Sequence, residues 1–336
     1  MKKGMILLLC LLLCGCDGLP RGREMGDMAL LRTMGVDGEE EGVRVTVSTG
    51  GREPVTLSSV GRSVGATCLG LEGQSDRYVF FGYVDQVLLG EELIRDDVLP
   101  TLDYLARDRE LSLGTRVWAV MEGEASETAG GTESRLSALD TDGAFGAALL
   151  SRSAGEVYAD LLELGGAWMP ALGGGAQELR ERGYAVLKDG RLAGYLTGEA
   201  MEGLELLLGR PEREVFVFEA EGQRVSLLVT GAEARFSFGE KGELSVFCRV
   251  EAIPLEYEES PGESVRRELS AALAGLERAR VSVALDQLQD WGADCLGMGA
   301  KAGLRDSDRW RALEGQWPVR FKDMETEIRV EDALRS

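Results

Sequence analysis

The apolar positions of the chain open with an unbroken run from Met5 to Leu13, which follows Lys2 and Lys3. A membrane-spanning helix needs about 20 apolar residues, so a run this short is typical of the apolar core of a secretory signal peptide. The sequence Leu13-Cys14-Gly15-Cys16 comes next and is expected to be a processing site. We therefore predict that residues 1–15 are removed and that the rest of the chain is exported.

A cysteine stands directly after the expected cleavage point. Leu13, Gly15 and Cys16 resemble the bacterial lipobox, in which the thiol of the final cysteine receives a diacylglyceryl group, although Cys14 is an unusual occupant. Each buried methylene contributes about 0.8 kcal/mol, so two or three acyl chains give a stable anchor where one chain is marginal. The pattern predicts a lipoprotein signal peptide over 1–15, a lipid on Cys16 and a lipidated tether over 16–22. The alternative is an ordinary secretory peptide with an incidental cysteine.

Over residues 23–175 the apolar pattern changes between helix and strand periods. Apolar residues three positions apart over 23–34 predict a helix that ends at Gly35-Val36-Asp37-Gly38. Further helices are expected over 66–71, 96–108 and 145–164, and strands over 43–47, 78–89 and 116–121. Residues 122–142 are polar and predict a loop, with or without a short helix. Strands and helices in this order predict an N-terminal α/β region over 23–175, made of one or two subdomains.

Residues 167–183 show a shift in composition. They contain Pro170, the triplet Gly173-Gly174-Gly175 and a charged stretch over 177–182, which together favour a linker or an exposed loop. The glycine triplet lacks the lysine and the Ser/Thr of a Walker sequence, so a phosphate-binding loop is not expected. We place the start of a C-terminal α+β domain, 183–336, after this segment.

The C-terminal domain is expected to begin with a hairpin, because Asp189-Gly190 separates two apolar runs. A short helix is predicted over 198–208, and then antiparallel strands over 214–218, 224–229, 232–238 and 244–252. Ser260-Pro261-Gly262-Glu263 resembles a capping box and predicts a long helix reaching about Trp291. A loop over 294–303, a helical turn over 310–317 and a strand over 325–330 follow. The expected fold class is thus α+β or mixed α/β, with mixed and antiparallel sheets packed by helices.

Composition narrows the classes of function. The net charge of −21 becomes −23 without Lys2 and Lys3, and so acidic a chain is not expected to bind nucleic acid or anionic head groups. The chain has no histidine, which removes the commonest general base and every histidine-based triad or zinc site. Three cysteines follow Cys16, and none lies in a C-x-x-C spacing: Cys68, Cys248 and Cys295. We expect these thiols to be buried, and the sequence does not decide whether two of them form a disulfide.

Four separated blocks of the chain follow one another in a recognisable order. They are Arg23-Glu24 with Gly35-Val36-Asp37; Leu88-Leu89-Gly90-Glu91-Glu92-Leu93 with Leu105-Ala106-Arg107-Asp108; residues 183–203; and Ala293-Asp294-Cys295-Leu296-Gly297-Met298-Gly299 with Trp310, Trp317 and Phe321. In this order they resemble the Ger(x)C family, the C-subunit lipoproteins of spore germinant receptors. The resemblance covers nearly the whole chain, and the C-terminal block is its most specific part.

The resemblance implies a multi-part ectodomain held by lipid at the outer face of the cytoplasmic membrane, which is the inner membrane of the spore. It further implies assembly with integral-membrane A and B subunits, in a receptor that responds to nutrients such as amino acids or sugars. Neither an enzymatic activity nor a cofactor is implied. The family often has Gly-His where this chain has Gly82-Tyr83, so a role for that imidazole is not expected here.

Ten residues carry the family signature, and each also has a structural interpretation. They are Asp37, Gly90, Glu91, Arg107, Asp294, Gly297, Gly299, Trp310, Trp317 and Phe321. The three aromatic residues share one helical stripe and are therefore expected in the core. Asp294 stands between a helix and glycines, which favours a capping or turn residue over a general base.

Two other functions are compatible with an exported, anchored chain. A solute-binding protein of a transporter generally alternates strands and helices in two similar lobes, which the meander predicted over 214–252 does not fit. An anchored hydrolase would work through paired carboxylates in a deep acidic pocket. We expect no such pocket in this chain.

Overall fold

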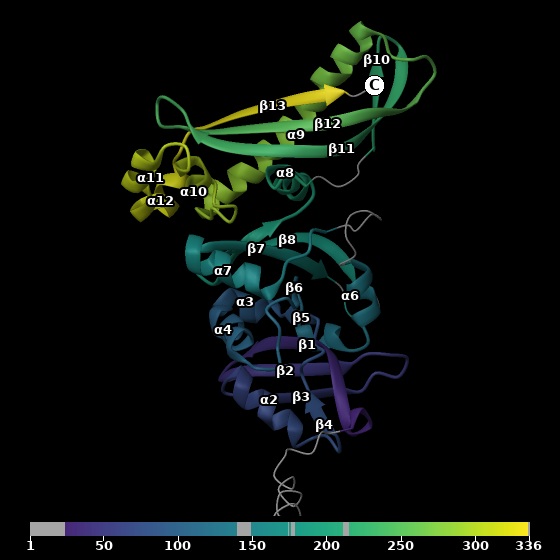
Figure 1. Cartoon of the computed structure of the whole chain (residues 1–336), viewed down its shortest axis with the longest axis vertical. Helices are drawn as coiled ribbons and strands as arrows, with labels where there is room; N and C mark the ends of the chain where they lie inside the picture. Colours follow the sequence, from purple (N-terminus) through teal and green to yellow (C-terminus); the bar gives the residue numbers. More distant parts are fainter. Residues whose placement is uncertain (1–23, 140–148, 174, 176–178, 211–214, 335–336) are drawn as a thin grey trace, which may run out of the picture.

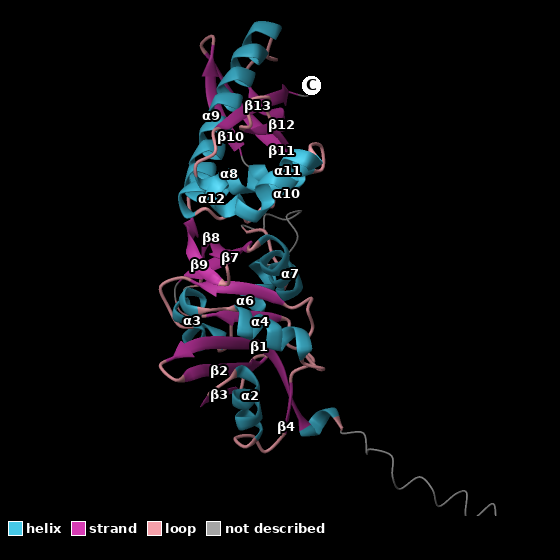
Figure 2. Cartoon of the chain, turned by 90° about the vertical axis from the view of Figure 1, so that its left-hand side faces the viewer, coloured by secondary structure: helices cyan, strands magenta, loops and turns pink. Residues whose placement is uncertain are grey.

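The computed structural model describes residues 24–139, 149–173, 175, 179–210 and 215–334. They form an elongated molecule with two sheets placed one after the other along its long axis (Figures 1 and 2). The first described residues lie at one end of the long axis, and the C-terminal sheet lies at the other. The expected signal peptide, Cys16 and the tether lie outside the described residues.

The first sheet has nine strands. They are β1 (Met28–Glu39), β2 (Gly42–Thr49), β3 (Thr56–Gly61), β4 (Tyr78–Phe80), β5 (Gln86–Leu89), β6 (Arg116–Val120), β7 (Gly166–Gly173), β8 (Arg180–Lys188) and β9 (Arg191–Leu196). Their order is β3-β2-β1-β5-β6-β7-β8-β9, with β4 paired to the start of β1. The run β1-β5-β6-β7 is parallel, whereas β2 and β3 at one end and β8 and β9 at the other are antiparallel. This mixed sheet confirms the expected fold class.

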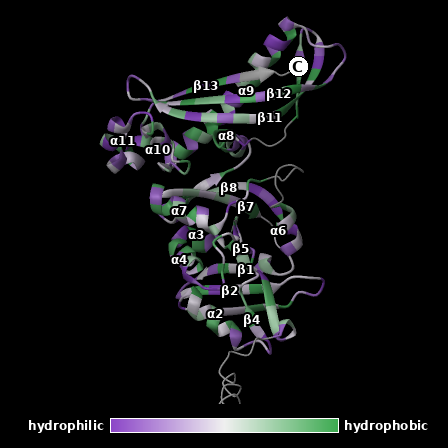
Figure 3. Ribbon diagram, viewed as in Figure 1, coloured by the Kyte–Doolittle hydropathy of each residue, from purple (hydrophilic) through white to green (hydrophobic). Residues whose placement is uncertain are grey.

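Helices cover both faces of this sheet. They are α2 (Val64–Glu72), α3 (Glu91–Asp96), α4 (Leu99–Arg107), α5 (Ala125–Ala129), α6 (Glu133–Leu139) and α7 (Ala154–Leu164). Val87 and Leu89 of β5 share one core with α2, α4 and α7, whereas Leu88 between them shares the other core with α5 and α6. Figure 3 shows hydrophobic stretches along the strands and mixed faces on the helices. A strand so enclosed lacks a solvent-facing side.

The second sheet has the order β10-β11-β12-β13. Its strands are β10 (Val215–Ala220), β11 (Gln223–Phe238), β12 (Leu244–Tyr257) and β13 (Thr326–Leu334), of which β13 runs parallel to β12. The helices of this part are α8 (Glu199–Leu207), α9 (Glu263–Trp291), α10 (Met298–Gly303), α11 (Ser307–Leu313) and α12 (Trp317–Lys322), with a 3-10 turn over Glu314–Gln316. The long helix α9 packs against the sheet, which confirms the helix expected to reach Trp291.

Residues 28–39 form β1, so the helix predicted over 23–34 is wrong. Only a 3-10 turn, Met25–Asp27, precedes the strand. From Thr33 to Asp37 every residue of β1 is buried, because the strand lies inside a sheet covered on both faces. Such a strand loses the alternation that identifies strands in a sequence. Gly35 does not end an element: a Cβ there would lie 2.8 Å from the Ala125 carbonyl oxygen, so it allows α5 to pack closely.

The linker or exposed loop predicted over 167–183 is wrong for 167–173, which lie in β7, and for 180–183, which lie in β8, whereas 174 and 176–178 lie outside the described residues. All eight residues of β7 are buried, and the sheet continues through β7 into the hairpin of β8 and β9. Pro170 is tolerated because β7 pairs with β6 only through Ala171 and Leu172. The hairpin around Asp189-Gly190 is confirmed, but it belongs to the first sheet and not to the meander that follows. Separate domains over 23–175 and 183–336 stay a prediction.

Several element bounds differ from their prediction. The strand expected over 78–89 is two strands, the helix over 96–108 is broken at Asp97, and the strands over 224–229 and 232–238 are one strand, β11. The strand β3 was not predicted, α7 begins only after Ser153, and α10 occupies part of the loop expected over 294–303. Helix α9 begins after Gly262 without a side-chain cap, so the capping box at Ser260 is wrong. The strands over 43–47, 116–121 and 325–330 are confirmed.

Candidate functional site

Three signature residues meet where the parallel strands β1 and β5 end. The Asp37 carboxylate accepts hydrogen bonds from the backbone N–H of Ala125 at 2.5 Å and of Ser126 at 2.8 Å. These N–H groups begin α5, so Asp37 caps a helix that is distant in the sequence. A Cβ at Gly90 would lie 2.0 Å from Asp37 Oδ1, which explains glycine at this position. Burial raises the pKa of Asp37, and the two backbone hydrogen bonds oppose that rise.

Glu91 follows Gly90 and connects three elements. Its carboxylate accepts hydrogen bonds from the Glu122 N–H at 2.9 Å, from Arg95 Nε at 2.8 Å and from the hydroxyl of Tyr195 on β9. Burial raises the pKa of Glu91, but these hydrogen bonds outweigh burial and the pKa is lowered overall. Glu91 thus remains a carboxylate that holds α3 against the sheet. We call Asp37, Gly90 and Glu91 the β1–β5 junction.

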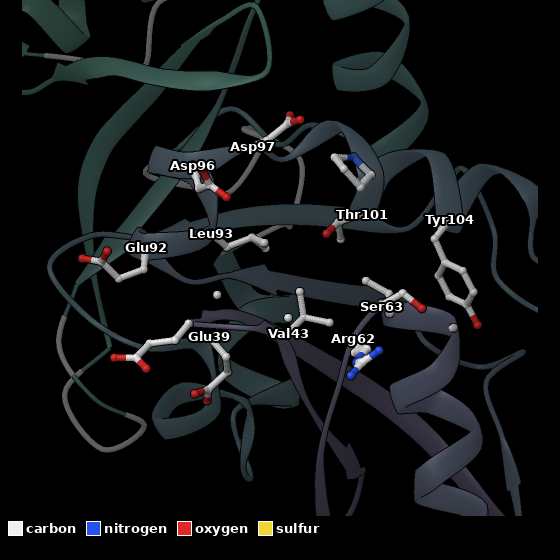
Figure 4. A pocket seen from close by; sticks show the side chains of 16 residues that line it. Glu39, Val43, Arg62, Ser63, Glu92, Leu93, Asp96, Asp97, Thr101 and Tyr104 are labelled. Carbon is white, nitrogen blue, oxygen red and sulfur yellow. The ribbon is translucent and has the colours of Figure 1, made fainter.

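An open cleft of about 990 Å³ lies beside this junction. It is bounded by the turn between β1 and β2, the start of α2, and helices α3 and α4 (Figure 4). The chain leaves β1 toward β2 on one side and leaves β5 toward β6 on the other. Strand order therefore reverses between β1 and β5, and the cleft lies outside the carboxyl ends of these two strands. Open α/β sheets bind ligands at such a point when both connections are crossovers, whereas here β1 connects to β2 by an antiparallel turn.

The cleft is acidic, and it is open rather than deep. Its lining includes five carboxylates, Glu39, Glu40, Glu92, Asp96 and Asp97, together with Arg62. Figure 4 shows Glu39 and Glu92 at one end of the cleft and Arg62 and Tyr104 at the other. Glu39 pairs with Arg44, and Asp97 accepts a hydrogen bond from the Leu99 N–H at 3.0 Å. Chemically, the cleft can hold a polar solute with a cationic group toward its acidic end.

Arg107 lies apart from the β1–β5 junction. Its side chain is largely exposed and forms an ion pair with Asp103, one helical turn earlier, at 2.9 Å. The same Asp103 accepts a hydrogen bond from Tyr158 of α7 at 2.9 Å, so the group joins α4 to α7 at the surface. An exposed pair of this kind contributes little to stability.

The C-terminal signature residues form a second cluster. The buried Asp294 carboxylate accepts hydrogen bonds from the N–H groups of Met298 at 2.8 Å and Gly299 at 2.9 Å, and from Trp317 Nε1 at 2.8 Å. A Cβ at Gly299 would lie 2.3 Å from the Trp317 ring. The Trp310 and Phe321 rings lie 5.2 and 5.7 Å from the Trp317 ring, measured between centroids.

This cluster confirms that its residues are structural, but the three aromatic residues do not share one helical stripe: Trp310 lies on α11, whereas Trp317 and Phe321 lie on α12, after the 3-10 turn. Asp294 caps the start of α10, as expected, and Trp317 and Phe321 are buried, whereas Trp310 is half-buried. Gly297 adopts a left-handed conformation with φ of 62° just before α10. Burial raises the pKa of Asp294, against the effect of its three hydrogen-bond donors.

Sequence reasoning missed the partners of the signature residues. Arg95 could have been found, because it stands four residues after Glu91 on a helix. Tyr195, Ala125 and Ser126 reach their carboxylates only through the sheet order, for which the sequence carries no short-range signal.

The three cysteines that follow Cys16 are buried, as expected, and they are free thiols. Burial raises the pKa of Cys68 to about 11 and that of Cys248 to about 12, so both are thiols at neutral pH. In the described ranges no group of three or more acidic or cysteine side chains is arranged to hold a metal ion. None of the helices described is both long and apolar enough to cross a bilayer.

Comparison with known proteins gives matches along the chain. Residues 21–131 match the profile of the spore germination protein N-terminal domain. Residues 182–336 match the profile described as spore germination B3/GerAC like, C-terminal. The two matched regions together cover more than half of the chain and stand in the order of their names.

One relative and one solved structure agree with these matches. A Bacillus subtilis (strain 168) protein named YfkR, described as a spore germination protein, is 23% identical over 360 residues, which cover 96% of this chain and 92% of the relative. The crystal structure of the GerBC protein has a TM-score of 0.62 and 15% identity, over 90% of this chain and 97% of that one. At this identity the structural likeness supports the fold.

Proposed function

Because the chain belongs to the Ger(x)C family of spore germination proteins, we propose that it is a non-enzymatic, lipid-anchored C subunit of a germinant receptor. In this function it assembles with integral-membrane A and B subunits and supports germination triggered by nutrients. The observation that carries the proposal is the match of both family domains, in order, over 21–131 and 182–336.

The membrane attachment in this proposal comes from Cys16. The net charge of −21 opposes electrostatic adhesion to anionic lipid, so acyl chains are the attachment that the sequence offers. A tether on Cys16 confines the ectodomain to the outer face of the membrane that holds the A and B subunits. Confinement raises the effective concentration of the partners for one another, which favours assembly.

The hydrogen bonds of the signature carboxylates support the proposal that the chain is not an enzyme. Asp37 and Asp294 accept backbone hydrogen bonds at helix starts, and Glu91 accepts hydrogen bonds from three side chains or backbone groups. Carboxylates committed to such bonds position helices.

The proposal is tested in spores of the host. A strain that lacks the gene should lose its response to at least one nutrient, and the intact gene should restore that response. The Cys16→Ala variant should be made but should fail to restore it. Deletion spores that respond to every nutrient of a broad panel as the parent does would overturn the proposal.

A second candidate function is that of a lipid-anchored solute-binding protein, and the acidic cleft at the strand-order reversal favours it. Calorimetry of the full chain against a panel of amino acids and sugars tests this candidate. Binding that is lost in Arg62→Ala and kept in Arg311→Ala, an exposed arginine far from the cleft, would support it. No heat of binding for any solute would exclude it within the panel.

A further inference from the structure

The described chain begins at the end of the molecule that carries β3, β4 and α2 (Figures 1 and 2). Met25 is exposed, and three residues later Met28 already pairs with Tyr78 of β4. Only seven residues lie between Cys16 and Glu24, and an extended chain spans at most about 29 Å over the eight steps that join them. If Cys16 carries lipid, as the proposed function holds, this end lies next to the bilayer and the second sheet lies away from it.

The same end exposes large apolar side chains on neighbouring elements. They are Met25 before β1, Val55 and Val60 at β3, Leu69 on α2 and Tyr83 after β4. Leu69 is 70% exposed although it lies on the helix that packs over β3. Exposed apolar side chains beside a free strand edge offer apolar contacts to a partner that pairs with that edge.

Strand β3 forms the edge of the first sheet at this end. Among the described residues its backbone pairs only with β2, so one row of its N–H and C=O groups is directed away from the sheet. Its sequence, Thr-Leu-Ser-Ser-Val-Gly, contains no charge and no proline, and every residue is at least partly exposed. Proteins usually protect an edge strand with charges, proline or a bulge, and β3 has none of these within its length.

The strands at the other sheet edges differ from β3 in their charge or in their position in the molecule. Strand β9, at the opposite edge of the first sheet, is packed by α3 and α9 as β3 is packed by α2, but unlike β3 it carries a charge, the exposed Arg191. Strand β13 carries Glu327, Arg329 and Glu331. Strand β10 is exposed like β3, but it is mostly apolar, carries Glu219 and belongs to the second sheet, far from the first described residues (Figure 1). Among the sheet edges that the structure describes, an uncharged strand and proximity to the tether thus coincide at β3.

We propose that the free edge of β3 is the docking site for an extended extramembrane segment of an integral-membrane receptor subunit, which adds a strand to the first sheet. The inference rests on the proposed function and assigns the surface through which assembly occurs. A polypeptide satisfies the outward row of N–H and C=O groups by main-chain hydrogen bonds, whereas acyl chains offer no partner to them. The exposed side chains of Val55, Val60 and Leu69 then provide apolar contact beside the added strand.

The test uses the full chain expressed together with the A and B subunits in membranes. A photo-crosslinking amino acid replaces Val60 and, in a matched control, Val217 of β10. The two valines both lie on sheet edges and are 55% and 54% exposed. Position 60 should crosslink to an extramembrane segment of the A or B subunit, identified by mass spectrometry, at least about tenfold more than position 217.

A pair of charge substitutions gives a second, independent measurement. Val60→Glu places a charge on the edge strand opposite Arg44 of β2, so folding should be kept while strand addition is opposed. The amount of A and B subunit that co-purifies should fall about tenfold, which corresponds to about 1.4 kcal/mol. Val217→Glu should leave co-purification unchanged, and both variants should melt within a few degrees of the parent chain.

The outcomes separate this inference from the proposed function. Equal crosslinking at both positions, crosslinks from position 60 to lipid alone, or undiminished co-purification of Val60→Glu would each overturn the β3 docking site and leave the subunit function standing. If the parent chain itself retains neither the A nor the B subunit, the proposed function fails and this inference fails with it.

Discussion

The Trp317 ring connects the residues of the C-terminal signature cluster. Removing this ring tests whether the signature is structural. In Trp317→Ala the ring is lost from contact with Trp310, Phe321 and Phe238, whose ring centroid lies 6.0 Å away. The Nε1–H that donates to the buried Asp294 carboxylate is lost as well. Trp317→Phe removes that donor and keeps most of the ring.

The two variants give different expected losses. Trp317 is 6% exposed, and truncating a buried tryptophan to alanine costs about 3 to 5 kcal/mol in free energy of unfolding. Trp317→Phe should cost about 2 kcal/mol, which is typical of a lost hydrogen bond to a charged group. The N–H groups of Met298 and Gly299 still donate to Asp294 in both variants. They compensate in part for the burial of its carboxylate.

Urea unfolding followed by circular dichroism measures these losses in the full chain kept in mild detergent. Val319→Ala is the matched control, because Val319 lies on the same helix and is 68% exposed. It should change the free energy of unfolding by less than about 0.5 kcal/mol. A loss below about 1 kcal/mol for Trp317→Ala would refute the packing argument and mark the ring as an interface residue.

Three further predictions concern the junction and the anchor. Gly90→Ala places a Cβ 2.0 Å from Asp37 Oδ1, which displaces the cap of α5, and thermal melting should report a loss of about 1 to 3 kcal/mol; no loss would show that the carboxylate moves freely. The pKa of Glu91 is lowered in the folded chain, so its contribution is present above the ordinary value of 4.5 and is lost as the pH falls through the lowered value. In pH-dependent melts Glu91→Gln should therefore be less stable than the parent chain at pH 7 and differ less from it near pH 3, whereas the control Glu92→Gln, at an exposed position, should change the free energy of unfolding at pH 7 by less than about 0.5 kcal/mol. Cys16→Ala should stay folded but leave the membrane fraction; loss of folding would show that the N-terminal segment is structural.

Short stretches of sequence were sufficient to predict an element when its own residues carry the pattern of a turn, a strand or a helix. The Asp189-Gly190 turn, the strand over 43–47 and the long helix to Trp291 follow from short-range patterns and are found in the structure. The first sheet could not be assembled in this way. Strand β1 is buried on both faces, and β7 contains a proline and glycines, so neither has the alternation by which strands are recognised.

The candidate site shows the same division. The signature residues were identified from the sequence, but their roles depend on contacts between distant segments. Asp37 caps a helix that begins 88 residues later, and Glu91 meets Tyr195 across the sheet. The acidic cleft likewise arises only when the turn after β1 is brought beside α3 and α4, so no window of the sequence could have predicted it.

The most direct test of the subunit assignment is the mass of the intact complex. The full chain, tagged at its C-terminus, is expressed together with the A and B subunits, purified in mild detergent and weighed by native mass spectrometry. We predict one particle that contains this chain and both membrane subunits, with lipid on the fragment that begins at Cys16. Recovery of this chain alone, with both membrane subunits present in the starting membranes, would contradict the account.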